Sequence, residues 1–108
     1  MPSPQQPNKS GWTVHFLVIE NFRDGDPRPV YQRFADRGRM APESVKYVSS
    51  WVTADLQHCY QIMECDDRSQ LDEWIGNWSD LVDFDVHDVI TSPEAARAVA
   101  ALPTAQRS

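Results

Sequence analysis

Three ionisable side chains, Asp83, Asp85 and His87, alternate along one segment and are the strongest candidates for chemistry. In an extended strand, alternate residues share a face and lie roughly 7 Å apart, so these three would form a row. Neighbouring carboxylates favour the protonated imidazole, which suits a general acid or base near neutral pH. We therefore expect His87 to be a catalytic acid or base, with Asp85 as its modulator. The alternative is a solvated strand whose charges discourage aggregation.

Two further candidates, His15 and Glu20, belong to an apolar segment near the start of the chain. His15 would approach His87 if the first and last strands are neighbours and the two residues share a face. The alternative for His15 is a core histidine with a satisfied hydrogen bond. Glu20 would be notable if it were buried, and is otherwise a strand-end charge in water. Both are included among the expected ligand-binding residues.

Tyr47, Trp51 and Gln61 are the side chains that we expect to form the wall of a ligand pocket. Small organic ligands favour apolar walls with one or two polar groups. The alternative for the aromatic residues is packing between two copies of the chain, since Tyr and Trp are common interface anchors. Arg37 and Arg39 flank Gly38, where we expect the first helix to end. They either bind an anionic group or interact favourably with the partial negative charge of the helix C-terminus.

The sequence does not indicate a cofactor, a resident metal or a covalent nucleophile. It contains no Cys-x-x-Cys, His-x-x-x-His or His-Glu-x-x-His spacing, and its four scattered glycines do not build a phosphate loop. A metal site would have to be assembled from His15, Asp85 and His87 across strands. Cys59 has no obvious paired histidine to activate it. We therefore expect no cofactor.

Composition and charge limit the classes of partner. The 108 residues carry a net charge of −6 without a Lys/Arg cluster among aromatics, which argues against nucleic acids and anionic membranes. No apolar run approaches the roughly 20 residues of a spanning helix, and the N-terminus lacks a signal pattern. Cys59 and Cys65 would lie roughly 20 Å apart on one strand, whereas a disulfide needs about 7 Å. Reduced thiols fit a cytoplasmic protein.

The hydrophobic pattern predicts four strands, at residues 12–20, 45–53, 57–64 and 81–90. A first helix should begin with Asp26 as its cap and Pro27 at its first position, and end near Gly38.

A second helix should open with a capping box at residues 67–70 and bury one stripe, formed by Leu71, Trp74, Ile75 and Trp78. A short third helix follows Ser92. We expect one domain at residues 12–102 between tails at 1–11 and 103–108.

This element order predicts an α+β, ferredoxin-like βαββαβ fold, a four-stranded antiparallel sheet with helices on one face. The other face of the sheet would then be bare. If the small residues of the second strand lie under the helices, Tyr47 and Trp51 join His87 on the bare face. Exposed aromatic patches mark interaction sites, and two-fold dimers are the commonest oligomers. We therefore expect a homodimer that covers this face.

A string of short motifs spans roughly residues 14 to 97 and carries a family resemblance. The motifs are Val18-Ile19-Glu20-x-Phe22, Pro29-Val30-Tyr31-x-Arg33-Phe34, Arg37-Gly38-Arg39-Met40, Tyr47-Val48-x-Ser50-Trp51-Val52, Gln61-x-Met63-Glu64-x-Asp66-Asp67, Leu71-Asp72-Glu73-Trp74-Ile75, Trp78-x-Asp80-Leu81-Val82-Asp83-Phe84 and Val89-Ile90-Thr91-Ser92. Together they resemble the bacterial domain-of-unknown-function family 3303, which is similar in layout to the dimeric α+β barrel group. The resemblance implies a ferredoxin-like fold and, by analogy to the wider group, a sheet-to-sheet dimer with a pocket. It implies no single reaction, because that group includes cofactor-independent oxygenases, isomerases, cyclases, haem-handling proteins and non-catalytic members.

Two functions therefore remain open from the sequence. The first is a dimeric α+β barrel protein that binds a small hydrophobic or aromatic metabolite, either between helices and sheet or at the dimer seam. As an enzyme it would catalyse cofactor-independent proton transfer, cyclisation, isomerisation or oxygenation. The alternative is a non-catalytic homodimer that binds a metabolite or a partner protein. The sequence does not decide between an enzyme and a binding protein.

Overall fold

The computed structural model describes residues 14–103, which form a four-stranded sheet and its helices. The elements in chain order are β1 (Val14–Phe22), a 3₁₀ turn η1 (Arg23–Gly25), α1 (Arg28–Arg37), β2 (Lys46–Val52), β3 (His58–Cys65), α2 (Arg68–Gly76), β4 (Val82–Val89) and α3 (Ser92–Ala100). The sheet order is β2-β3-β1-β4, and every neighbouring pair is antiparallel. This arrangement confirms the predicted ferredoxin-like α+β fold. The expected N-terminal tail, residues 1–11, lies outside the described residues, as do residues 104–108 of the expected C-terminal tail.

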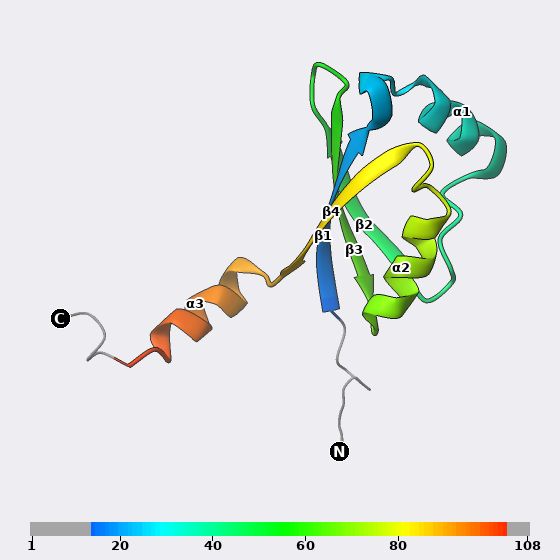
Figure 1. The fold of residues 1–108 in the computed structure, drawn as a ribbon. Coiled ribbons are helices and arrows are strands. Elements are labelled where there is room, and N and C mark those ends of the chain that lie inside the picture. The colour runs from blue at the N-terminus through cyan, green and yellow to red at the C-terminus, as the bar shows by residue number, and fades with distance from the viewer. Residues whose placement is uncertain (1–13, 104–108) are drawn as a thin grey trace.

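Helices α1 and α2 lie on the same side of the sheet, while α3 stands apart from it (Figure 1). The side chains of β1 alternate in burial, with Phe16, Val18, Glu20 and Phe22 all buried on the side of the helices. The most completely buried side chains come from the sheet and α2: Trp74, Met63, Leu71, Val18 and Val82. The core therefore lies between the helix-facing side of the sheet and the helices.

The second helix packs as its sequence predicts, but the expected capping box does not form, because the Gln70 side chain makes no return hydrogen bond to the cap. The Asp67 carboxylate caps α2 by accepting the backbone N–H of Ser69 at 2.9 Å. Leu71, Trp74 and Trp78 are buried, and Ile75 packs partly buried against them, so the predicted core stripe is confirmed.

The start of α1 differs slightly from the prediction. Pro27 takes the cap position instead of the first helical position. The Asp26 carboxylate nevertheless accepts the backbone N–H of Arg28 at 3.0 Å and so supplies the capping hydrogen bond. At the other end, Gly38 has a φ of 70°, in the left-handed region that favours glycine at a helix end.

A bulge in β2 changes which face its aromatic residues occupy. The register shifts between Tyr47 and Ser49, so that Tyr47 lies opposite the buried Met63 and Trp51 lies opposite Tyr60. Cross-strand partners share a face, which places Tyr47 under the helices and Trp51 on the opposite side. The expectation that Tyr47 and Trp51 share the bare face is therefore wrong for Tyr47.

The other side of the sheet is not covered by either α1 or α2, the two helices that pack on the sheet within residues 14–103 (Figure 1). We call this side the bare face and define it by residues His15, Leu17, Ile19, Asn21, Trp51, His58, Tyr60, Ile62, Glu64, Asp83, Asp85 and His87. Trp51 is 78% exposed and Tyr60 is 39% exposed. Among the described residues, no helix is long and apolar enough to cross a membrane.

Candidate functional site

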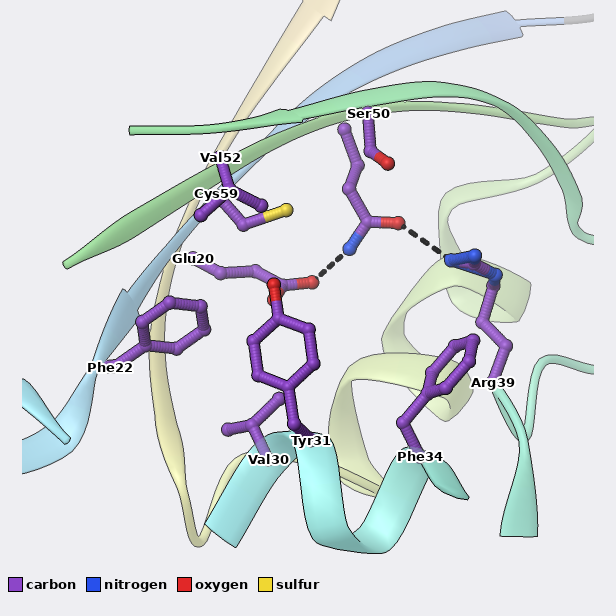
Figure 2. A pocket seen from close by; sticks show the side chains of 10 residues that line it. Glu20, Phe22, Val30, Tyr31, Phe34, Arg39, Ser50, Val52 and Cys59 are labelled. Carbon is purple, nitrogen blue, oxygen red and sulfur yellow. Dashed lines mark hydrogen bonds between the residues drawn. The ribbon is translucent and has the colours of Figure 1, made fainter. Parts of the chain in front are cut away.

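A cavity of about 160 Å³ lies between α1 and the helix-facing side of the sheet. Figure 2 shows its side chains, with those of α1 opposite those of the strands. The lining residues are Glu20, Phe22, Val30, Tyr31, Phe34, Arg39, Ser50, Val52, Cys59 and Gln61. An engineered protein cavity of about 150 Å³ binds benzene, so this space suits a molecule built on one ring or a short branched chain. Apolar walls with a few polar groups are typical of ligand sites.

Three polar side chains along this cavity, Glu20, Gln61 and Arg39, are joined by hydrogen bonds. The side-chain amide of Gln61 donates a hydrogen bond to the Glu20 carboxylate, and Arg39 donates one to the Gln61 carbonyl oxygen at 3.1 Å (dashed lines in Figure 2). Glu20 is only 7% exposed and Gln61 only 5%. A guanidinium has donors and no acceptor, so it fixes the amide with its oxygen toward Arg39 and its nitrogen toward Glu20.

Burial changes the acidity of Glu20. Removal from water raises its pKa from 4.5 to about 7, because the charged carboxylate is disfavoured in an apolar setting. The hydrogen bond from Gln61 and the charge of Arg39 oppose this rise in the pKa. A carboxyl with a pKa near 7 populates both protonation states at neutral pH, which is the condition for general acid–base catalysis.

The other titratable side chains along the cavity stay protonated at neutral pH. Burial, and secondarily the charge of Glu20, raise the pKa of Cys59 from 9.0 to about 12. Burial also raises the pKa of Tyr31. Cys59 is therefore a poor nucleophile here, because the thiolate is the reactive form. Glu20 is the acid–base group that the cavity offers.

Arg39 is held in place from several directions. Its guanidinium carbon lies 3.9 Å from the centre of the Tyr47 ring and 5.2 Å from that of Phe34. Its backbone carbonyl accepts indole N–H bonds from Trp74 at 3.0 Å and from Trp78 at 2.9 Å. The loop between α1 and β2 is thereby tied to α2 and the segment after it.

A second, smaller cavity of about 40 Å³ lies next to the first. Both are lined by Glu20, Arg39 and Gln61, and Trp74 and Trp78 also line the smaller one. Glu20, Gln61 and Arg39 therefore form a polar layer shared by the larger cavity, which we call the outer cavity, and the smaller one.

The structure divides the residues expected to form one site into two sets. Glu20 and Gln61 line the outer cavity, and Tyr47 contacts Arg39 at its edge. His15, Trp51, Asp85 and His87 lie on the bare face instead. The sheet separates the two sets, so one chain does not combine them in a single pocket. The catalytic role expected for His87 and Asp85 stays a prediction.

His15 and His87, two of the three histidines on the bare face, are diagonal neighbours. β1 pairs with β4, with Leu17 opposite His87 and His15 opposite Val89. The Nε2 atom of His15 lies 3.3 Å from the Glu64 carboxylate. His15 is thus a partly exposed residue with a carboxylate partner and not a core histidine. Within residues 14–103, no group of three or more His, Cys, Asp and Glu side chains is arranged to hold a metal ion.

Sequence reasoning misses part of the cavity wall. From the sequence, Tyr31 and Phe34 are only members of a helical stripe, and Cys59 is only a reduced thiol. Tyr31 and Phe34 are both substantially exposed although they are large and apolar, because they border an open cavity. The sequence does indicate Arg39 as a possible anion-binding residue, but it does not place Arg39 near Glu20.

Comparison with known proteins identifies a family but no function. No curated protein and no solved structure matches the chain. Residues 14–103 match the family described as a domain of unknown function (DUF3303). This match spans every described strand and helix, including all residues that line the outer cavity. The chain therefore belongs to the DUF3303 family.

Proposed function

We propose that the protein binds a small organic molecule in the outer cavity and exchanges a proton with it through Glu20. The observation that carries this proposal is the position of the carboxyl group, which lines an apolar cavity and has a pKa of about 7. An ordinary surface carboxyl would be fully ionised at neutral pH and would be a weak base.

The surrounding residues support a proton-transfer role. Gln61 holds the Glu20 carboxylate by a hydrogen bond, which keeps the base in one orientation. Arg39 stabilises the negative charge that forms when Glu20 gives up its proton. The ionised carboxylate would remove a proton from a carbon of the ligand and return it to the same carbon or a neighbouring one. Exchange or isomerisation of this kind consumes no oxidant and leaves no net charge behind.

Deuterium exchange tests the proposal even while the substrate is unidentified. A panel of small ketones, lactones and unsaturated acids is incubated with the protein in D₂O, and loss of C–H signal is followed by proton NMR. We expect accelerated exchange for at least one compound, and at least a hundredfold loss of that rate in Glu20→Gln. Glu73→Gln, which changes an exposed carboxyl of α2, is the matched control and keeps the rate.

The same experiment separates the competing explanations. Loss of exchange in His87→Ala with full activity in Glu20→Gln would move the chemistry to the bare face, where the sequence pattern alone places it. Binding of a panel member without any exchange would support the non-catalytic alternative, a binding protein. An exchange rate that is unchanged in Glu20→Gln would overturn the proposed role of this carboxyl.

We also propose that a second copy of the chain covers the bare face. The support is the apolar centre of that face, which includes Leu17, Ile19 and Ile62 together with the exposed rings of Trp51 and Tyr60. In such a dimer His15 and His87 would lie at the seam. Native mass spectrometry tests this proposal, because a monomer at micromolar concentration would contradict it.

A further inference from the structure

We propose that the ligand of the outer cavity is a small monocarboxylate, whose anionic group pairs with Arg39 while its apolar part fills the space between α1 and the sheet. This inference rests on the proposed function, because it names the class of molecule that the cavity binds. It is argued from the charge, the orientation and the surroundings of Arg39.

Within residues 14–103, Arg39 forms no direct ion pair with a carboxylate, and the charge of Glu20 reaches it only across Gln61. Four other arginines form ion pairs, and these pairs are Arg23–Asp83, Arg28–Asp26, Arg33–Asp80 and Arg68–Asp72. The hydrogen bond that Arg39 donates goes to the Gln61 amide, which is neutral. Arg39 is also half-buried, so water hydrates its charge less than that of an exposed arginine. A partly buried cation without a directly bound anion favours an anionic ligand.

The contacts of Arg39 orient its guanidinium for such a ligand. The rings of Tyr47 and Phe34 lie over the guanidinium, which attracts them through their negative faces. A cation–π contact is not a hydrogen bond, so it leaves the N–H donors of the guanidinium available. Carboxylates bind to such donors through two parallel hydrogen bonds. The rings and Gln61 therefore fix the guanidinium without neutralising it.

The rest of the cavity selects among anions. Phe22, Val30 and Val52 contribute apolar wall, which cannot replace the water around a multiply charged ion such as phosphate. The space of about 160 Å³ accepts one ring or a short branched chain. The protein as a whole carries a charge of −6, so it does not attract anions in general. Selection of a monocarboxylate therefore depends on this one site.

Binding should be coupled to the protonation of Glu20. The charged or titratable groups that face this carboxyl are Arg39 from the loop, Cys59 from β3 and Tyr31 from α1, while its partner on β4 is Phe84. A bound carboxylate adds a second negative charge beside Glu20 and so favours its protonated form. The protein should take up a proton when the ligand binds above neutral pH.

Calorimetric titration with a matched pair of probes tests the inference. Benzoate and benzamide have nearly the same shape, and they differ in the charge that Arg39 would recognise. At pH 6.5 we expect benzoate to bind at least about tenfold more tightly than benzamide. In Arg39→Gln this preference should vanish while benzamide binding is kept, and in Arg37→Gln, the neighbouring control, it should persist. Arg39→Lys, which keeps the charge, should retain part of the preference for benzoate. That result would show that the loss of preference in Arg39→Gln comes from the lost charge and not from misfolding.

Proton linkage gives a second readout. At pH 8, with a pKa of about 7, only about a tenth of Glu20 is protonated, so benzoate binding should draw a proton from the buffer. Titrations in two buffers of different ionisation enthalpy measure this uptake, and Glu20→Gln should abolish it.

The outcomes separate this inference from the proposed function. Binding of benzamide at least as tight as that of benzoate would overturn the anion preference and leave the cavity as a site for neutral molecules. A preference for benzoate that survives Arg39→Gln would also overturn it. Binding of neither probe would overturn both the anion preference and the proposed use of the cavity.

Discussion

Gln61 donates its side-chain amide hydrogen bond to Glu20 across the central pair of strands, although the two residues are not register partners. Glu20 lies opposite Cys59, and Gln61 lies opposite Val18, so the hydrogen bond runs diagonally over the helix-facing side of the sheet. This diagonal contact allows a carboxyl to be buried among apolar side chains, because the amide supplies the partner that water would otherwise provide. It also links Glu20 to Arg39.

The buried carboxyl should make stability depend on pH. Glu20 has a pKa of 4.5 when it is exposed and about 7 in the fold, so between these values the folded protein holds a proton that the unfolded chain releases. The contribution of Glu20 to stability is therefore full below pH 4.5 and is lost as the pH rises toward and through 7. The difference between 4.5 and about 7 corresponds to about 3 kcal/mol.

Urea denaturation of Glu20→Gln and the unchanged protein between pH 4 and 8 measures this effect. We expect Glu20→Gln to be more stable at pH 8 by up to about 3 kcal/mol, and the gap to close toward pH 4.5. The amide oxygen of the new side chain can still accept the Gln61 hydrogen bond. Glu73→Gln should follow the unchanged protein across the range. Equal stability of Glu20→Gln and the unchanged protein at pH 8 would count against a buried, neutral-range carboxyl.

The fold is predictable because its main determinants are local in the sequence. Alternating or continuous apolar runs locate the strands, and the Leu71, Trp74, Ile75 and Trp78 stripe locates α2. The burial of Glu20 can be named as an option from the sequence but not decided. Whether a strand-end carboxyl is covered depends on α1 and on the loop that carries Arg39, and this packing has no local signal.

The face of Tyr47 is not predictable because it depends on a bulge. One extra residue between Tyr47 and Ser49 reverses the alternation of β2. No glycine or proline in the strand marks this position. Simple alternation places Trp51 on the correct side and Tyr47 on the wrong one. The division of the expected single site has a different cause, because ordinary alternation along β1 puts His15 and Glu20, five residues apart, on opposite faces of the sheet.

Cys59 should react slowly with alkylating reagents in the folded protein. With a pKa of about 12, only on the order of one thiol in ten thousand is ionised at pH 8. Iodoacetamide labelling of a Cys65→Ser variant reports on Cys59 alone, and its rate should rise about tenfold per pH unit up to pH 10 without a plateau. Adding Glu20→Gln removes the negative charge that raises the pKa of Cys59, so labelling should become faster. A plateau near pH 9 would show an ordinary thiol and contradict this burial.

Trp74 and Trp78 should couple through the carbonyl group of Arg39, which accepts both indole N–H groups. Trp74→Phe or Trp78→Phe alone leaves the carbonyl with one partner, whereas the double variant leaves it with none. We expect the double variant to lose more stability than the sum of the single variants, by about 1 kcal/mol. Urea denaturation of the four proteins gives this coupling energy. Strict additivity would show that the two indoles do not hold the loop together.

Trp51 should control dimer formation if a second copy covers the bare face. Trp51→Lys places a charge at the most exposed aromatic residue of that surface, on the edge strand β2. We expect this change to raise the dissociation constant of a dimer at least a hundredfold. Light scattering during gel filtration measures the mass. Leu56→Lys introduces the same charge at an exposed apolar residue of the β2–β3 hairpin loop and should leave the dimer intact. Equal masses for the two variants would place the interface elsewhere.

The central claim is that Glu20 titrates near neutral pH inside the cavity, and carbon-13 NMR of the glutamate carboxyl groups tests it most directly. The Glu20 resonance, assigned by its absence in Glu20→Gln, is followed from pH 3 to 9. We expect a midpoint near 7, clearly separated from the exposed glutamates. A midpoint near 4.5 would contradict the claim, because the cavity would then contain an ordinary carboxylate with no capacity to act as an acid at neutral pH.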